Sequence, residues 1–458
     1  MNFTGLLFLL VFLPIALVVY YIAFKRLKEY VLLALSVVFY TFGELKHIWL
    51  LLIMIVFTVL IGRMISHIDK QWLKRTLLIS GVLANIGVLF AFKSMIAFSV
   101  SSAVTILPLG ISFYTFKAVS YLADVYKGTV ILKGTPVVHD ALYLSFFAHI
   151  QSGPLTRYKD MVCKPEPKRF CDGVCRFLMG FSKKILLADI LSHITTEVFA
   201  TPLDGFAAGY AWLGSICYSL QLYYDFSGYS DMAIGISKMF GYDCMENFDH
   251  PYMTESISRF WRRWHISLSE WFRDYVYIPL GGSRVKPGSR VYLNLFIVWI
   301  LTGIWHGMSL NFIAWGLGYF VMISFERITG LPDKLKSRPL KIAYRIFTLF
   351  FINCEWILFR ASSLSYGAGF ISHLFMRSTS PLVGRRTTVL MSEYAVFIVI
   401  ALILCLPVEK LADRLTGKSR AAANAFGFVQ AGILIAAFAV ALSFVVSGSN
   451  NPFVYANF

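Results

Sequence analysis

The sequence predicts an all-α polytopic membrane protein, and composition is the first observation behind this prediction. Hydrophobic residues make up 57% of the 458 residues, charged residues make up 15%, and the mean hydropathy is +0.66. Soluble globular proteins carry about 25% charged residues. So few charged side chains cannot keep an apolar chain of this length in water. We therefore expect one membrane domain covering residues 1–458, with the lipid bilayer as its surroundings.

Apolar runs separated by basic loops are the second observation. Phe3–Phe24 is long enough to span, because about 20 apolar residues cross a hydrocarbon core of about 30 Å. The further runs predicted as membrane segments are Tyr30–Phe42, Ile48–Ile65, Leu77–Phe92, Phe177–Ala200, Ile346–Phe359, Tyr394–Leu406 and Phe426–Val446. Together with shorter and re-entrant pieces, about ten or eleven segments are expected.

The sign of the charge is the third observation. Lys and Arg outnumber Asp and Glu by 42 to 25, and basic clusters follow the first and third apolar runs. By the positive-inside rule these loops are cytoplasmic and the N-terminus lies outside. A basic face would also attract an anionic cofactor or an acidic carrier. Nucleic-acid binding is not expected, because the basic residues are scattered between apolar spans and no recognisable binding module accompanies them.

Two polar stretches interrupt the apolar pattern. Ile106–Tyr126 reads ILPLGISFYTFKAVSYLADVY, and its Pro, Gly and Ser residues predict broken or tilted helices. Tyr210–Tyr224 leads into DFSGYSDM, where Asp225 has two interpretations of equal weight. It could be the N-cap of a following helix, or it could belong to a polar cavity within the membrane.

The stretch from Ser258 to Gly307 is the most unusual part of the chain. It begins SRFWRRWHISLSEWFRDYVYIPLGGSR, with arginines and aromatic residues around a single histidine, His265. Read as one helix, Ser258–Asp274 places Trp261, His265 and Leu268 near one face. Such a helix is too polar to face lipid. It would lie at the membrane surface or line a wet funnel, where arginine stems reach the interface.

A length argument places a second histidine, His306, inside the membrane. Val291–Phe325 contains 35 residues without one formally charged side chain. One straight helix of that length would measure about 52 Å, which exceeds a hydrocarbon core of about 30 Å. The run must therefore break, and Thr302–Asn311, with its two glycines, is the natural place. An ionisable residue at that depth is either functional or a neutral histidine that ties two helices together.

The two histidines suit acid–base chemistry better than metal binding. An imidazole with an ordinary pKa near 6.5 can accept a proton from a hydroxyl at neutral pH, and a positioned base contributes roughly 10²- to 10⁴-fold in rate. His306 is the candidate base, and His265 could orient it, hold a donor or stabilise an oxyanion. Neither belongs to H-E-x-x-H or a comparable ligand spacing, so no metal is expected. A G-x-S-x-G elbow is missing around them, which disfavours a serine hydrolase.

Several long motifs resemble the membrane-bound O-acyltransferase family, in particular its bacterial alginate O-acetylation branch. They are PLGISFYTFKAVSYLADVYKG, SGPLTRY, YYDFSGYSDMAIGISKMFGY, NFDHPYMTESISRFWRRWHISLSEWFRDYVYIPLGGSR, LTGIWHGMSLNFIAWG, WILFRASSL and the terminal NPFVYANF. These motifs cover most of the chain in order. IPLGGSR and the aromatic C-terminal ending favour the polysaccharide-acetylating group over the group that transfers D-alanyl.

The resemblance implies a multi-helix core with re-entrant or broken helices and a central funnel or tunnel. It implies His306 as the catalytic residue and His265 as a second functional histidine, with Trp305, Asp225 and Arg262 as further cavity residues. No bound cofactor is implied. The acyl donor would be acetyl-CoA, or another cytoplasmic donor or carrier.

The acceptor implied by the resemblance is a hydroxyl of an extracytoplasmic polysaccharide or of a partner acetyltransferase. Transfer could be direct or could pass through an acetyl-histidine. The expected location is the bacterial inner membrane, crossed many times. The alternatives are D-alanyl or other acyl transfer to a cell-wall polymer, a transporter with an intramembrane histidine, and a membrane scaffold; no inverted repeat supports the transporter.

Overall fold

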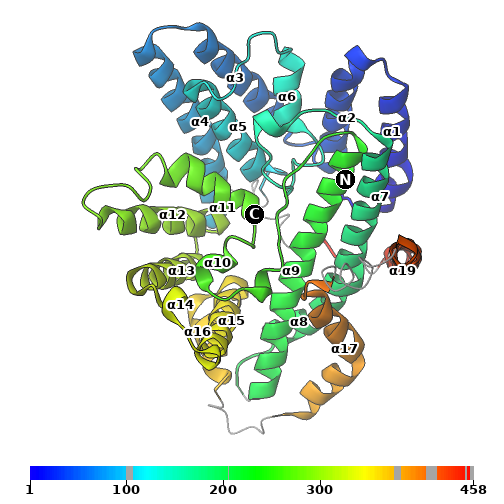
Figure 1. Cartoon of the computed structure of the whole chain (residues 1–458), viewed down its shortest axis with the longest axis vertical. Coiled ribbons are helices and arrows are strands. Elements are labelled where there is room, and N and C mark those ends of the chain that lie inside the picture. The colour runs from blue at the N-terminus through cyan, green and yellow to red at the C-terminus, as the bar shows by residue number, and fades with distance from the viewer. Residues whose placement is uncertain (99–106, 205, 376–382, 409–419, 449–450, 454–458) are drawn as a thin grey trace. The chain divides into compact units, whose positions relative to one another are not determined.

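The computed structural model describes residues 1–98, 107–204, 206–375, 383–408, 420–448 and 451–453 (Figure 1). These residues are mostly helical and form no β-strand, only the isolated bridges Cys163 to Tyr242 and Phe248 to Trp264. The predicted all-α class is confirmed.

The chain folds into two compact units. The first contains Met1–Phe181, Tyr229–Glu246 and Leu442–Phe458, and the second contains Ser182–Gly228 and Asn247–Ala441. Helix α9 (Ala208–Met239) contributes residues to both units. The single domain over residues 1–458 stays a prediction.

The first unit is a bundle of helices built mainly from residues 1–181. Its elements are η1 (Phe8–Phe12), α1 (Leu13–Ile22), η2 (Lys25–Leu27), α2 (Lys28–Gly43), α3 (Ile48–His67), α4 (Gln71–Ala97), α5 (Ile111–Lys127), α6 (Val137–Ser145), η3 (Tyr158–Asp160) and α7 (Pro167–Ser182). The apolar runs predicted at Tyr30–Phe42, Ile48–Ile65 and Leu77–Phe92 are confirmed as helical by α2, α3 and α4.

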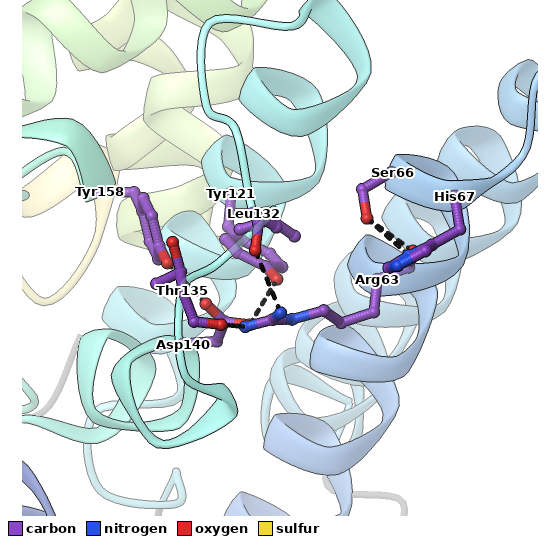
Figure 2. Close-up of polar contacts among 8 residues, drawn as sticks. All are labelled: Arg63, Ser66, His67, Tyr121, Leu132, Thr135, Asp140 and Tyr158. Atoms are coloured by element: carbon purple, nitrogen blue, oxygen red, sulfur yellow. Dashed lines mark hydrogen bonds and ion pairs between the residues drawn. The ribbon is translucent and has the colours of Figure 1, made fainter.

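A buried carboxylate, Asp140 of α6, ties three helices of this unit together (Figure 2). Arg63 of α3 donates from Nε to Asp140 Oδ2 at 2.7 Å, and its other nitrogens donate to two backbone carbonyls. Tyr158 and Tyr121 donate their hydroxyls to the same carboxylate at 2.6 and 3.2 Å. Because each oxygen of Asp140 is hydrogen-bonded, a charged group is stable inside an apolar bundle.

Helix α5 corrects the prediction of broken helix in Ile106–Tyr126. Residues 111–127 form one uninterrupted α-helix, and residue 106 lies outside the described residues. The irregular backbone is confined to the residues before it, where Gly110 has a φ of 68° and a Cβ would lie 1.9 Å from the carbonyl oxygen of Ile150. Two of its polar side chains have carbonyl partners: Lys117 Nζ donates to the carbonyl oxygen of Tyr143 at 3.1 Å, and Ser120 Oγ donates to the carbonyl oxygen of Lys117 at 2.9 Å.

The second unit carries the stretch from Ser258 to Gly307. Its elements are η4 (Lys183–Asp189), α8 (Ile190–Ala200), the start of α9, η5 (Pro251–Met253), α10 (Ile257–Phe260), α11 (Ile266–Phe272), η6 (Arg273–Tyr277), α12 (Arg290–His306), α13 (Leu310–Thr329), α14 (Leu331–Lys334), α15 (Arg338–Arg360), α16 (Leu364–His373), α17 (Arg385–Leu404) and most of α19 (Arg420–Val446). The runs predicted at Ile346–Phe359, Tyr394–Leu406 and Phe426–Val446 are confirmed as helical by α15, α17 and α19.

Five helices of the described residues are long and apolar enough to cross a membrane: α3, α4, α15, α17 and Ala425–Val446 within α19. Phe8–Ile22 and Arg290–His306 are shorter apolar helical stretches. The remaining helices carry more polar residues or are shorter, so the full number of crossings stays a prediction.

Candidate active site

His306 is the last residue of α12, and a turn of three residues, 307–309, separates it from α13. The break predicted within Thr302–Asn311 is therefore confirmed. The two helices fold back on each other closely, because a Cβ on Gly316 would lie only 2.5 Å from the carbonyl oxygen of Trp299. Small residues of this kind let helix backbones approach in a membrane.

Four aromatic rings surround His306 and form what we call the aromatic enclosure: Trp305, Phe312, Trp315 and Phe359. The rings of Trp315 and Phe359 each stand edge to face with the imidazole, with centroids 5.0 Å away. His306 is 6% exposed. Edge-to-face contacts fix the plane of a ring, and apolar walls keep bulk water from a base.

His265 lies at the start of α11, in a backbone conformation that is uncommon for a residue with a side chain. Its φ is 45° and its ψ is 52°, in the left-handed region. The side chain of Asn247 holds this turn: its Oδ1 accepts from Ser267 N at 3.2 Å and from Ser267 Oγ at 2.9 Å. His265 Nδ1 lies 3.1 Å from the same oxygen.

The partner of His265 Nδ1 fixes the tautomer of the ring. An amide oxygen can only accept, so Nδ1 carries the hydrogen and donates it. In the neutral ring Nε2 then holds the lone pair. His265 is 1% exposed, and this burial lowers its pKa to about 3, so the ring is neutral at physiological pH.

The structure corrects the prediction of one amphipathic helix over Ser258–Asp274. Helix α10 ends at Phe260, a turn follows, and α11 begins only after His265. Trp264 and His265 are buried within the protein, and the position of this stretch relative to the membrane surface stays a prediction. Two residues that precede Ser258 hold this turn: Asn247 contacts His265, and Phe248 forms a bridge with Trp264. The residue pattern of Ser258–Asp274 alone does not predict these contacts.

Trp305 brings the two histidines into one site. Its ring centroid lies 4.4 Å from that of His306 and 6.5 Å from that of His265. Phe226 of α9 packs edge to face on His265 at 4.6 Å. Three residues predicted from the sequence therefore meet within the second unit.

Asp225 lies in the interior of α9, so its interpretation as an N-cap is wrong. Lys184 Nζ lies 2.7 Å from Asp225 Oδ1 and 2.6 Å from Asp189 Oδ1, and all three side chains are buried. Sequence reasoning missed this ion triad. The sequence feature that could have predicted the triad is the pair of charged residues Lys184 and Asp189 within the apolar run Phe177–Ala200. Both belong to a π-helical segment, from which Lys184 reaches Asp225.

The remaining sequence-predicted residue does not join this site. Arg262 lies in the turn after α10 with an exposed side chain, and its backbone N–H donates to the carbonyl oxygen of Arg259 at 3.2 Å. Across the residues that the structure describes, no group of three or more His, Cys, Asp or Glu side chains is arranged to hold a metal ion.

The profile of the membrane-bound O-acyltransferase family matches residues 32–367. The chain belongs to the membrane-bound O-acyltransferase family. This match confirms the resemblance found in the motifs, and it identifies the protein as a membrane O-acyltransferase.

Individual relatives of this membrane-bound O-acyltransferase cover different shares of its length. A Pseudomonas aeruginosa protein named "Probable alginate O-acetylase AlgI" is 36% identical over 393 residues, 80% of this chain and 73% of the relative. The peptidoglycan O-acetyltransferase of Helicobacter pylori is 34% identical over 352 residues, 67% of this chain and 66% of the relative. The teichoic acid D-alanyltransferase of Bacillus subtilis is 33% identical over 236 residues, 47% of this chain and 58% of the relative.

Proposed function

We propose that this O-acyltransferase moves an acetyl group from acetyl-CoA, presented from the cytoplasm, to hydroxyls of an extracytoplasmic bacterial polysaccharide. One observation carries the proposal: His306 and His265 both contact Trp305, in a chain that is 36% identical over 80% of its length to a relative named as an alginate O-acetylase. The protein would act as a multi-pass enzyme of the inner membrane, with no resident cofactor.

His306 would act as the general base. Its neutral imidazole takes the proton of the acceptor hydroxyl while the hydroxyl oxygen attacks the thioester carbonyl. The new C–O bond forms, the C–S bond breaks, and the proton passes from the imidazolium to the departing thiolate. The products are an O-acetyl ester and free CoA thiol.

The tautomer of His265 narrows the roles open to it. A ring whose Nε2 carries a lone pair accepts hydrogen bonds there and cannot stabilise an oxyanion through that atom. With its pKa lowered to about 3 by burial, the imidazolium form is also absent at neutral pH. His265 would therefore hold a donor group such as a substrate hydroxyl or amide.

The acceptor hydroxyl would belong either to the polysaccharide itself or to a serine of an extracytoplasmic partner acetyltransferase that passes the acetyl group onward. Transfer of D-alanyl from a carrier protein is the competing chemistry. The D-alanyltransferase relative covers 47% of this chain against 80% for the alginate O-acetylase relative, so acetyl transfer is favoured.

A labelled-donor assay tests the proposal. Membranes from cells that make the protein and its acceptor are given acetyl-CoA labelled in the acetyl group, or a D-alanyl carrier labelled in D-alanine, and label in the polymer is counted. We expect acetyl label alone, with His306→Ala reducing transfer at least roughly 10²-fold. His67→Ala, at an exposed histidine of α3, is the matched control. Full acetyl transfer by His306→Ala, or label from D-alanine alone, would overturn the proposal.

A further inference from the structure

A basic pocket lies in the second unit, apart from the two histidines. Helices α10, α14 and α15 border a cavity of about 300 Å³. Six of its lining side chains are charged: Glu255, Arg259, Asp333, Arg338, Lys341 and Arg345. Neither the aromatic enclosure nor the ion triad of Lys184 contributes to this pocket.

Both carboxylates of the pocket form ion pairs with the same arginine. Arg259 is paired with Glu255 and, at 3.0 Å, with Asp333. Among the described residues, no carboxylate lies within ion-pair distance of Arg338, Lys341 or Arg345. Arg345 instead directs Nη2 at Met253 Sδ, 3.2 Å away. The pocket therefore holds three cations that no acid of the described residues neutralises.

The N-terminus of α15 adds a second source of positive potential. The helix has 23 residues, begins after Ser337 with a proline in its first turn, and its N-cap side chain accepts no hydrogen bond. Its first-turn N–H groups carry the positive end of the helix dipole. Arg338 and Lys341 stand on this same turn. Phosphate oxygens are the anions that such a combination of cations and helix N–H groups binds best.

Buried hydrogen bonds hold the floor of the pocket in place. Tyr344, which lines the pocket, donates its hydroxyl to Glu326 Oε1 at 2.8 Å. The same carboxylate accepts from the backbone N–H groups of Ile257 at 2.7 Å and Ser258 at 2.8 Å. Glu326 is buried and joins α10, α13 and α15 at one point. A floor of this kind keeps the helices that carry the cations in position before a ligand arrives.

The same two helices lead from this pocket to His306. Along α13, Glu326 at the pocket and Trp315 at the enclosure are 11 residues apart, or about 16 Å. Along α15, Tyr344 and Phe359 are 15 residues apart, or about 22 Å. A ligand whose phosphate end sits in the pocket must carry its reactive group on a long arm to reach His306.

The basic loop next to the pocket indicates the side of the membrane. Arg327, Lys334, Lys336, Arg338 and Lys341 fall within 15 residues of the sequence. By the positive-inside rule this loop faces the cytoplasm. That is the side on which a soluble phosphorylated donor, or an anionic lipid of the inner leaflet, would be met.

We propose that the pocket of Arg338, Lys341 and Arg345 is a phosphate-binding site that takes the phosphate groups of a ligand from the cytoplasmic side. The phosphates could be those of CoA. The site would then anchor the acyl donor, and this part of the inference rests on the proposed function. They could also be those of an anionic phospholipid headgroup. Both sources use the same chemistry, and the experiment separates them.

Binding is measured on the full chain in nanodiscs of phosphatidylcholine. CoA and inorganic phosphate are titrated by calorimetry, and phosphatidylglycerol retained by the protein is counted by native mass spectrometry. The test variant is Arg338→Ala with Lys341→Ala. Arg338→Lys with Lys341→Arg keeps the charge, and Lys70→Ala with Arg75→Ala removes the same charge from exposed sites at α4.

We expect the alanine pair to weaken the binding of the phosphate ligand by roughly tenfold for each cation removed, since the loss of one charge-assisted hydrogen bond lowers affinity by about that factor. The other two pairs should bind nearly as the native chain does. Loss of CoA binding identifies the donor as the source, and loss of retained phosphatidylglycerol alone identifies the lipid. If the alanine pair folds, as shown by an unchanged melting temperature, and binds all three probes like the native chain, the site is refuted, whatever the acetyl-transfer assay gives.

Discussion

The imidazole of His306 meets the indole of Trp315 edge to face, with ring centroids 5.0 Å apart and planes inclined by 82°. Trp315 is 0% exposed. Among the described residues, none accepts a hydrogen bond from its Nε1. A buried donor without an acceptor costs about 1–3 kcal/mol, and an acceptor atom of a ligand bound beside the proposed base would remove this cost.

Trp315→Phe is expected to lower acyl transfer by at least roughly tenfold while the protein stays folded. The change keeps an aromatic ring against His306 and removes only the N–H that would donate to a substrate carbonyl. Initial rates and the melting temperature in detergent check this expectation. Trp212→Phe, on α9, is the control, because Trp212 lies outside the aromatic enclosure and its Nε1 donates to the carbonyl oxygen of Leu374 at 3.1 Å. Equal rate losses in both variants would assign the effect to packing.

The stability of the protein should depend on pH through His265. Its pKa is about 3 in the folded state, against about 6.5 in an unfolded chain, so the unfolded state binds the extra proton between these values. The free energy of unfolding therefore does not depend on the protonation of His265 above about pH 6.5. Below that, it decreases by up to about 1.4 kcal/mol per pH unit as the pH drops toward 3. Unfolding of the native chain and of His265→Gln, compared from pH 7 to pH 4, measures the difference. Parallel curves would show that His265 is not the group responsible.

The sequence could predict the helix break that follows His306 but not the turn at His265, for a physical reason. The break after α12 can be predicted from one continuous segment, because only the length of its apolar run and the thickness of the membrane are needed. The turn at His265 depends on Asn247, 18 residues earlier, whose amide oxygen holds a left-handed backbone in place. The spacing of apolar residues in Ser258–Asp274 therefore predicts one helix through this turn.

Long-range pairing explains the other differences as well. Asp225 precedes a helix-like run, as an N-cap does, but Lys184 from another element stabilises it in the interior of α9. Residues 111–127 contain enough polar groups to look irregular, yet they form one helix, in which the carbonyl oxygen of Tyr143 accepts from the buried Lys117. Apolar runs alone were sufficient to predict α2, α3, α4, α15, α17 and α19.

The ion triad should respond unequally to the loss of its members. Lys184→Met leaves Asp189 and Asp225 buried without their cation, which is expected to destabilise the fold by about 3–5 kcal/mol. Asp225→Asn leaves one carboxylate for one ammonium and should cost much less. Melting temperatures of the two variants give the order. Because Asp225 adjoins Phe226, which packs on His265, Lys184→Met should also lower the transfer rate. A larger loss of stability in Asp225→Asn would contradict this account.

The turn after His306 leaves no room for a side chain at Gly307. A Cβ there would lie 2.4 Å from the ring of Phe312, which belongs to the aromatic enclosure. The backbone at this residue is extended, with φ of 179°, so the conflict is one of space alone. Gly307→Ala must displace Phe312 and is expected to cost about 1–3 kcal/mol of stability and most of the transfer activity. Gly427→Ala, where a Cβ meets nothing within 4 Å, should change neither. Combining Gly307→Ala with Phe312→Leu, which shortens the displaced side chain, should restore stability more than activity, because the ring against His306 is then missing.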